Sequence, residues 1–292
     1  MADQAAAACP EARSVAGAGP AGRQVWSRYR VGALQVERRD GGGRAVLFVH
    51  GAAGGPWCWR GFMERFAAAG YDCHAMALRG HPPSDPVPAL GRVRLVDYVS
   101  DVRRVLERLD EAVLIGHSMG GALVQAVAVT CDVAALILAA PAPVAGVRFQ
   151  RPPWHPWLPV QAVRALPAFL GRAVVRPHLP SLRWMVFNRI PREQQQEIFA
   201  RCNAESSTAY LGLLQGHLNR EGESLRGRPF KRLVVAATAD RICIFPMQRE
   251  IARQQGAELL MLIDHAHMFM LEPGWERCAD RLLDWLRQAL MT

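Results

Sequence analysis

The chain has 292 residues, of which 50% are hydrophobic and 21% charged, and its formal net charge is +9. This length allows one large domain with a buried core, and the composition excludes a disordered chain. No apolar run reaches the ~18 residues of a membrane-spanning helix, and the basic residues are dispersed along the chain. The composition therefore favours neither stable membrane insertion nor nucleic-acid binding, which requires a basic patch.

Residues 1–22 are rich in Ala, Gly and Pro and lack the basic start and apolar centre of a secretory signal, so we expect a disordered tail. After this tail, short apolar runs alternate with segments of helical spacing. The predicted order is an edge strand pair at 24–37, strand 45–49, helix 57–69, strand 71–78, helix 95–109, strand 112–115, helix 119–130 and strand 133–139.

The alternation stops between residues 141 and 229, a stretch rich in Pro, Trp and Arg. It contains no clear buried strand, but amphipathic helical segments are predicted at 161–175, 181–188, 192–202 and 207–218. The alternation then resumes with strand 233–238, helix 247–255, strand 258–263 and helix 275–290.

Strands that alternate with helices predict an α/β fold in which helices cover both faces of a mostly parallel, eight-stranded sheet. The interruption predicts a helical cap inserted after core strand six. The expected domains are a core formed by residues 23–140 and 230–292 and a cap, or lid, formed by residues 141–229.

Residues 116–120 read Gly-His-Ser-Met-Gly, a G-x-S-x-G motif between a predicted strand and a predicted helix. This context is the one that a nucleophile elbow requires. The turn is so tight that its central residue is strained and the residues two positions away must lack side chains. We therefore predict that Ser118 is a nucleophile raised above the sheet, and that the Met119 N–H faces a developing oxyanion.

The loop His50-Gly51-Ala52-Ala53-Gly54-Gly55 follows the predicted strand 45–49. In such sites this loop supplies the second oxyanion donor, and we assign that role to the Ala52 N–H, directly after His-Gly. His50 is interpreted as a structural residue that bonds the loop backbone, and His117 as a packing residue beside the nucleophile.

The acid is expected before the histidine in chain order and after a later strand. Asp240 follows strand 233–238 and is the predicted acid, with Asp264 as the rival. His265 and His267 both follow strand 258–263, and only one of them can receive the proton of Ser118. We favour His267, although the sequence pattern alone leaves both open.

Together these motifs resemble the α/β-hydrolase superfamily, and within it cap-bearing bacterial hydrolases of the lysophospholipase-like or carboxylesterase-like kind. The resemblance covers residues 44–288, and its most specific part is His267 followed by Met-Phe-Met-Leu-Glu-Pro-Gly-Trp. In that group the histidine before this run is catalytic, which supports His267. The resemblance also implies a cofactor-free monomer or homodimer with a helical lid. One departure is Gly80-His81-Pro82-Pro83-Ser84, where the family usually has Gly-His-Gly-x-Ser.

The predicted chemistry is cleavage of a carboxylic ester or thioester through an acyl-enzyme, without a metal or a cofactor. Two alternatives remain open on this scaffold: a C–C bond hydrolase or lyase, and a ligand receptor that turns over poorly. A serine at the elbow argues against a dehalogenase, because dehalogenases of this fold have a similar motif with an aspartate at that position.

The expected partner is a small-molecule or lipid-like acyl substrate. Seven cysteines, an odd number without C-x-x-C spacing, argue against a disulfide framework or a zinc site and favour a cytoplasmic location.

The cap is strongly basic. Residues 141–229 contain twelve arginines, five glutamates and no aspartate or lysine. Such a lid would attract an acyl substrate with an anionic head, and Trp154, Trp157, Trp184 and Phe187 could line its apolar part. The alternative is that codon bias placed arginines on a solvated lid surface.

Overall fold

An eight-stranded sheet forms the centre of the computed structural model, which describes residues 25–144, 146–148, 156, 158–216, 218 and 225–291. The tail predicted at residues 1–22 lies outside the described residues, as do Trp154 and Trp157. The strands are β1 (Trp26–Val31), β2 (Leu34–Arg39), β3 (Ala45–Val49), β4 (Asp72–Met76), β5 (Val113–His117), β6 (Ala135–Ala139), β9 (Lys231–Ala237) and β10 (Glu258–Leu262).

The strand order is β1-β2-β4-β3-β5-β6-β9-β10. β1 pairs with β2 and β2 with β4 in antiparallel fashion, whereas every pair from β4 to β10 is parallel. The sequence-based prediction of a mostly parallel sheet with an edge strand pair is thus confirmed. β5 and β6 are buried along their whole length, as strands of a parallel sheet covered on both faces are expected to be.

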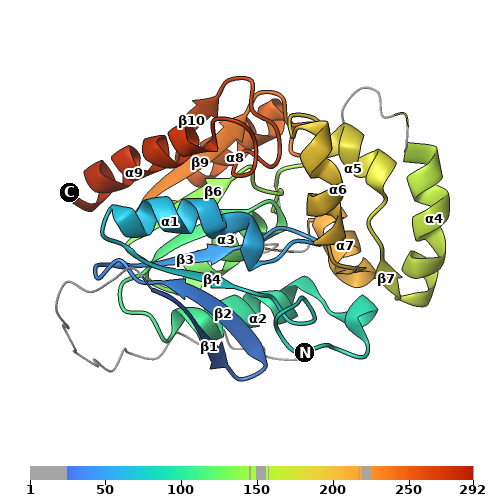
Figure 1. Cartoon of the computed structure of the whole chain (residues 1–292), viewed down its shortest axis with the longest axis horizontal. Coiled ribbons are helices and arrows are strands. Elements are labelled where there is room, and N and C mark those ends of the chain that lie inside the picture. The colour runs from blue at the N-terminus through green and yellow to red at the C-terminus, as the bar shows by residue number, and fades with distance from the viewer. Residues whose placement is uncertain are drawn as a thin grey trace.

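Helices cover both faces of this sheet (Figure 1). One face packs against α2 (Leu95–Leu106), α3 (Met119–Thr130) and α8 (Phe245–Gln255), and the other against α1 (Arg60–Ala68) and α9 (Trp275–Met291). Alternate residues of β3 point to opposite faces of the sheet. Leu47 and Val49 pack into the core with α2, α3 and α8, and Val46 and Phe48 pack into the core with α1 and α9. The α/β-hydrolase architecture expected from the sequence is therefore present.

The segment between β6 and β9 contains α4 (Leu158–Gly171), α5 (Leu179–Met185), α6 (Arg192–Ala200) and α7 (Ser207–Leu214). These helices lie together beside one end of the sheet, at the right of Figure 1. Helices were expected at all four places. A short antiparallel pair, β7 (Val174–Val175) with β8 (Glu205–Ser206), was not expected.

Five described cysteines carry free thiols, namely Cys58, Cys73, Cys202, Cys243 and Cys278. Cys131 takes part in a disulfide, so the sequence argument against disulfides fails at this position. Within the described ranges, no helix is long and apolar enough to cross a membrane.

Candidate functional site

Ser118 occupies the sharp turn between β5 and α3. Its φ of +52° and ψ of −119° are a conformation that residues with side chains rarely adopt. The strain persists because the surrounding packing fixes it: a Cβ on Gly116 would lie 2.4 Å from the Gly120 carbonyl oxygen, and one on Gly120 would lie 2.5 Å from the His50 carbonyl oxygen. The side chain is therefore held out of the sheet, and Ser118 is partly exposed while its neighbours are buried.

Asp240 lies directly beyond the carboxyl end of β9, with its side chain fully buried. Oδ1 accepts the N–H groups of Ile242 (2.7 Å) and Cys243 (2.9 Å), while Oδ2 accepts the Gln248 side-chain amide (3.3 Å). These donors compensate a buried negative charge and fix the orientation of the carboxylate.

His267 lies in the loop between β10 and α9, and its Nδ1 is 2.8 Å from Oδ2 of Asp240. A carboxylate at this distance favours the tautomer that carries the proton on Nδ1 and leaves Nε2 as an acceptor. His117 supports the loop from the other side, because its Nε2 donates to the His267 carbonyl oxygen at 2.9 Å and its ring lies 4.6 Å from that of His267. Burial and the neighbouring His267 hold the pKa of His117 well below its ordinary value, so His117 is a neutral support.

Cys243 connects the serine to this pair. Its N–H donates to Asp240. Burial raises the pKa of its thiol well above the ordinary value, and the nearby Ser118 hydroxyl lowers it. Among the described residues, no hydrogen bond joins Ser118 to His267 directly. The structure thus brings the three predicted residues into one cluster.

The two predicted oxyanion donors flank the serine. Met119 is the first residue of α3, where backbone N–H groups have no helical acceptor. Ala52 follows Gly51, which packs so closely that a Cβ there would lie 2.9 Å from Cβ of Ser118. In the described part of the chain, neither amide donates a hydrogen bond to the protein, so both can face a ligand.

The two rivals have other partners. His265 lies 3.3 Å from Oε2 of Glu272 and 3.3 Å from the Cys278 thiol. Asp264 is exposed and pairs with Arg189 at 3.3 Å. Burial raises the pKa of Glu272 to about 7, and its Oε2 also accepts the Ala266 N–H, so this second pair shapes the loop that carries His267.

Sequence reasoning missed Cys243 and Gln248, and it gave His117 no contact with His267. Their only signal was proximity in the chain to Asp240 and Ser118. His50 has the expected structural role: its Nδ1 donates to the Gly51 carbonyl oxygen at 2.8 Å, and its Nε2 accepts the Leu78 N–H at 3.1 Å. Burial lowers the pKa of this neutral ring to about 3.

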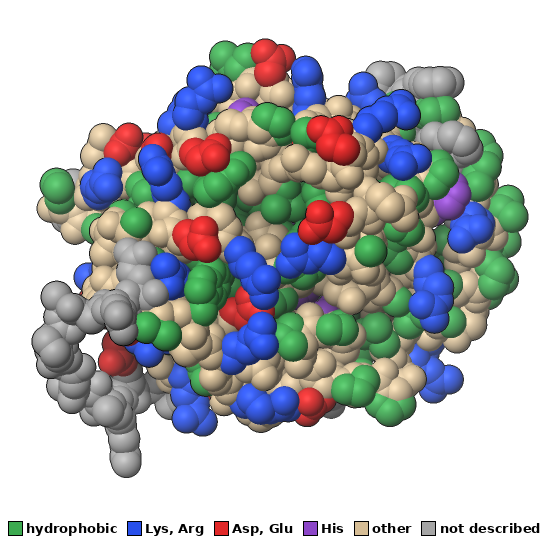
Figure 2. Space-filling view, in the orientation of Figure 1, with side chains coloured by type: hydrophobic (Ala, Val, Ile, Leu, Met, Phe, Trp, Pro, Cys, Tyr) green, Lys and Arg blue, Asp and Glu red, His purple; other side chains and the backbone are tan. Residues whose placement is uncertain are grey.

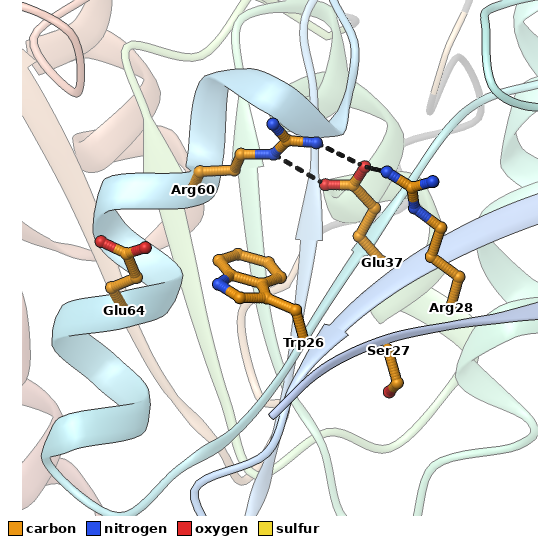
Figure 3. Close-up of a pocket in the computed structure, with 6 residues that line it drawn as sticks. All are labelled: Trp26, Ser27, Arg28, Glu37, Arg60 and Glu64. Carbon is orange, nitrogen blue, oxygen red and sulfur yellow. Dashed lines mark hydrogen bonds and ion pairs between the residues drawn. The ribbon is translucent and has the colours of Figure 1, made fainter. Parts of the chain in front are cut away.

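A surface hollow of about 590 Å³ lies elsewhere, over β1, β2 and the start of α1. It is lined by Trp26, Ser27, Arg28, Glu37, Arg60 and Glu64 (Figure 3). Glu37 pairs there with Arg28 (3.4 Å) and Arg60 (2.9 Å), so the charges that face the hollow largely neutralise one another. None of the predicted site residues lines it. No group of three or more His, Cys, Asp or Glu side chains in the described ranges is arranged to hold a metal ion.

Comparison with known proteins decides the family. Residues 46–281, most of the chain, match the model of the alpha/beta hydrolase family. The chain belongs to the α/β-hydrolase family. It is similar to an esterase from Exiguobacterium antarcticum, with a TM-score of 0.66, 20% identity and coverage of 87% of this chain and 95% of that one. It is also similar to a putative aryl esterase from Burkholderia cenocepacia, with a TM-score of 0.69, 17% identity and coverage of 89% and 96%.

Among curated proteins, a pyrethroid hydrolase from Sphingobium wenxiniae is 35% identical over 81 residues, which is 26% of this α/β-hydrolase and 28% of the relative. The acetyltransferase component of an acetoin cleaving system from Cupriavidus necator is 33% identical over 113 residues, 38% of this chain and 29% of the relative. The alignments thus span little more than a quarter of either relative's length.

Proposed function

We propose that this α/β-hydrolase cleaves carboxylic esters or thioesters through an acyl-enzyme formed on Ser118. One observation carries the proposal: a histidine whose Nδ1 is fixed by a buried carboxylate at 2.8 Å lies in the same cluster as a serine held in a strained elbow. This combination supplies a nucleophile, a base and the group that orients the base.

In the first step the Ser118 hydroxyl turns toward Nε2 of His267. Serine Oγ then attacks the substrate carbonyl carbon while His267 takes its proton, and Asp240 stabilises the resulting imidazolium.

The Ala52 and Met119 N–H groups receive the negative charge that develops on the carbonyl oxygen. Each such donor contributes about 3 kcal/mol in comparable sites. When the tetrahedral intermediate collapses, His267 protonates the leaving alcohol or thiol. Water then attacks the acyl carbon and gives a proton to His267. His267 passes this proton to Oγ of Ser118 as the acid is released, which regenerates the free serine.

The similar proteins described above support an ester as the substrate class, since they include esterases and a pyrethroid hydrolase. We further propose that residues 141–229 form a lid that selects the substrate. Figure 2 shows basic and apolar side chains, without acidic ones, over α4 at the right of the molecule. A C–C bond hydrolase or a poorly active receptor remains the alternative on this scaffold.

A fluorophosphonate probe tests the proposal. Wild-type protein should form one covalent adduct, located at Ser118 by mass spectrometry, and Ser118→Ala should form none while retaining its fold. A panel of p-nitrophenyl esters of increasing chain length, together with acyl-thioesters, should show turnover that Ser118→Ala lowers by on the order of 10⁴-fold or more. Turnover of the variant within tenfold of wild type contradicts the role of Ser118.

A further inference from the structure

A fully buried carboxylate, Glu205, lies in β8 of the segment between β6 and β9. Its Oε1 accepts the Tyr98 hydroxyl (2.7 Å) and the Ser206 N–H (2.8 Å). Its Oε2 accepts the Ala53 N–H (3.0 Å) and lies 3.1 Å from Nε2 of His81. Four donors thus converge on one carboxylate that has no access to water, and the proposed mechanism uses none of them.

The geometry around His81 favours an ion pair. Nδ1 lies 3.1 Å from the Arg79 carbonyl oxygen, which can only accept, so Nδ1 carries a proton. Nε2 faces a carboxylate oxygen that already accepts from Ala53, so Nε2 carries a proton too. The pKa of His81 is raised by Glu205 against the opposing effect of burial, and the pKa of Glu205 is lowered by His81, which agrees with a charged pair.

The segment that carries β8 forms two further hydrogen bonds with the loop after β3. The Asn203 N–H donates to the Ala53 carbonyl oxygen at 2.7 Å, and the Asn203 side-chain amide donates to the Gly54 carbonyl oxygen at 2.8 Å. Both backbone polar groups of Ala53 are therefore bound by residues about 150 positions later in the chain. Ala53 also has a φ of +57°, a conformation that an alanine keeps only when its surroundings impose it.

The geometry points to Glu205 as a positioning residue that holds the loop after β3 so that the adjacent Ala52 N–H faces the oxyanion. The inference rests on the proposed function, because it concerns the donor that this function assigns to Ala52. The carboxylate comes from the proposed lid segment and the loop comes from the core. The Ala52 N–H is therefore positioned for the oxyanion only when the lid segment is in place.

Glu205→Gln tests the inference, because each carboxylate oxygen accepts one backbone N–H. Whichever way the glutamine amide is turned, its NH₂ group faces one of these N–H groups, and His81 loses its counter-charge. We expect kcat for a p-nitrophenyl ester to fall by on the order of 10²-fold, as when an oxyanion donor is lost, with KM changed less than about threefold. Amide hydrogen exchange of a peptide covering residues 50–55 should accelerate in the same variant.

Tyr98→Phe is the matched control, because it removes a donor from Oε1, the oxygen that does not touch Ala53. It should leave kcat within about threefold of wild type and exchange of residues 50–55 unchanged. Should Glu205→Gln fail to fold, Asn203→Ala replaces it: this change removes only the bond to Gly54, and kcat should fall several-fold at constant KM.

Ser118→Ala is assayed in parallel to separate the two claims. If Ser118→Ala retains activity, the proposed function fails. Amide exchange of residues 50–55 in Glu205→Gln still reports whether Glu205 holds the loop. If Ser118→Ala is inactive but Glu205→Gln keeps wild-type kcat and exchange, the positioning role is wrong. Equal losses of kcat in Glu205→Gln and Tyr98→Phe also overturn it, because they indicate general destabilisation.

Discussion

In the described part of the chain, His267–Asp240 and His81–Glu205 are the two histidine–carboxylate pairs with both members buried. They differ in how many ring nitrogens the protein binds. In the His267–Asp240 pair only Nδ1 is bound, at 2.8 Å, and among the described residues Nε2 has no hydrogen-bond partner. In the His81–Glu205 pair both ring nitrogens are bound, one to a carbonyl oxygen and one to the carboxylate. The first ring can exchange a proton with a substrate or nucleophile, while the second can only hold structure. The same two residue types therefore serve chemistry or positioning according to whether one nitrogen is left available.

The largest expected effect separates His267 from the nearby His265. His267→Ala should lower kcat by on the order of 10⁴-fold or more, because members of a triad act as a unit. His265→Ala removes contacts with Glu272 and Cys278 and should have a much smaller effect. Steady-state kinetics on one ester compares the two variants, and an inactive His265→Ala beside an active His267→Ala reverses the assignment.

Asp240→Asn should lower kcat by about 10³- to 10⁴-fold without loss of fold, because an amide that donates to Nδ1 selects the wrong tautomer. The drop should exceed that of Glu205→Gln, since only the first change alters a proton-transferring ring. Circular dichroism supplies the check on folding. If Glu205→Gln lowers kcat more than Asp240→Asn does, the assignment of one pair to proton transfer and the other to positioning is wrong.

The charged pair should also be visible in stability as a function of pH. Glu205 has a lowered pKa, so its contribution is present above its ordinary value of 4.5 and is lost as pH falls through the folded value. His81 has a raised pKa, so its contribution is present below its ordinary value of 6.5 and is lost as pH rises through the folded value.

The difference in unfolding free energy between wild type and Glu205→Gln should therefore be largest between pH 4.5 and 6.5, at ~2 kcal/mol. It should decrease on both sides of that window. Urea titrations at pH 4, 5.5 and 8 measure it, and a difference that does not depend on pH contradicts the ion pair.

The smallest expected effect concerns the proposed lid, residues 141–229, and its arginines. If its arginines attract an anionic substrate, kcat/KM for a carboxylated ester should fall several-fold between low and ~0.5 M salt, while a neutral ester of equal length should barely respond. Equal responses of the two esters would assign these arginines to a solvated surface with no role in substrate capture.

Sequence reasoning succeeded where the physical constraint is local. The spacing of Gly116, Ser118 and Gly120 reflects a turn whose steric limits act within five residues, and the alternation of apolar strands with helices reflects burial on both faces of the sheet. The pair formed by His81 and Glu205 could not be predicted in this way. The two residues are 124 positions apart, and no helical or strand periodicity of the sequence relates positions so distant. The strand pair β7–β8 is also too short, at two residues each, to produce a pattern.

The assignment of His267 over His265 depended on the family-like run that follows it, since both histidines leave the same strand. Only the three-dimensional arrangement shows that Asp240 bonds His267 and that Glu272 bonds His265. Apart from its closeness in the chain to Asp240, Cys243 had no sequence signal, because a cysteine in an apolar stretch is as a rule only a small core residue.

The contact between Ser118 and Cys243 has a consequence for the design of covalent inhibitors. The Cys243 side chain is fully buried, and burial raises the pKa of its thiol well above the ordinary value, so the thiol remains protonated at neutral pH. Soft electrophiles that seek thiolates should therefore react slowly, whereas phosphonates and boronic acids should select the serine oxygen.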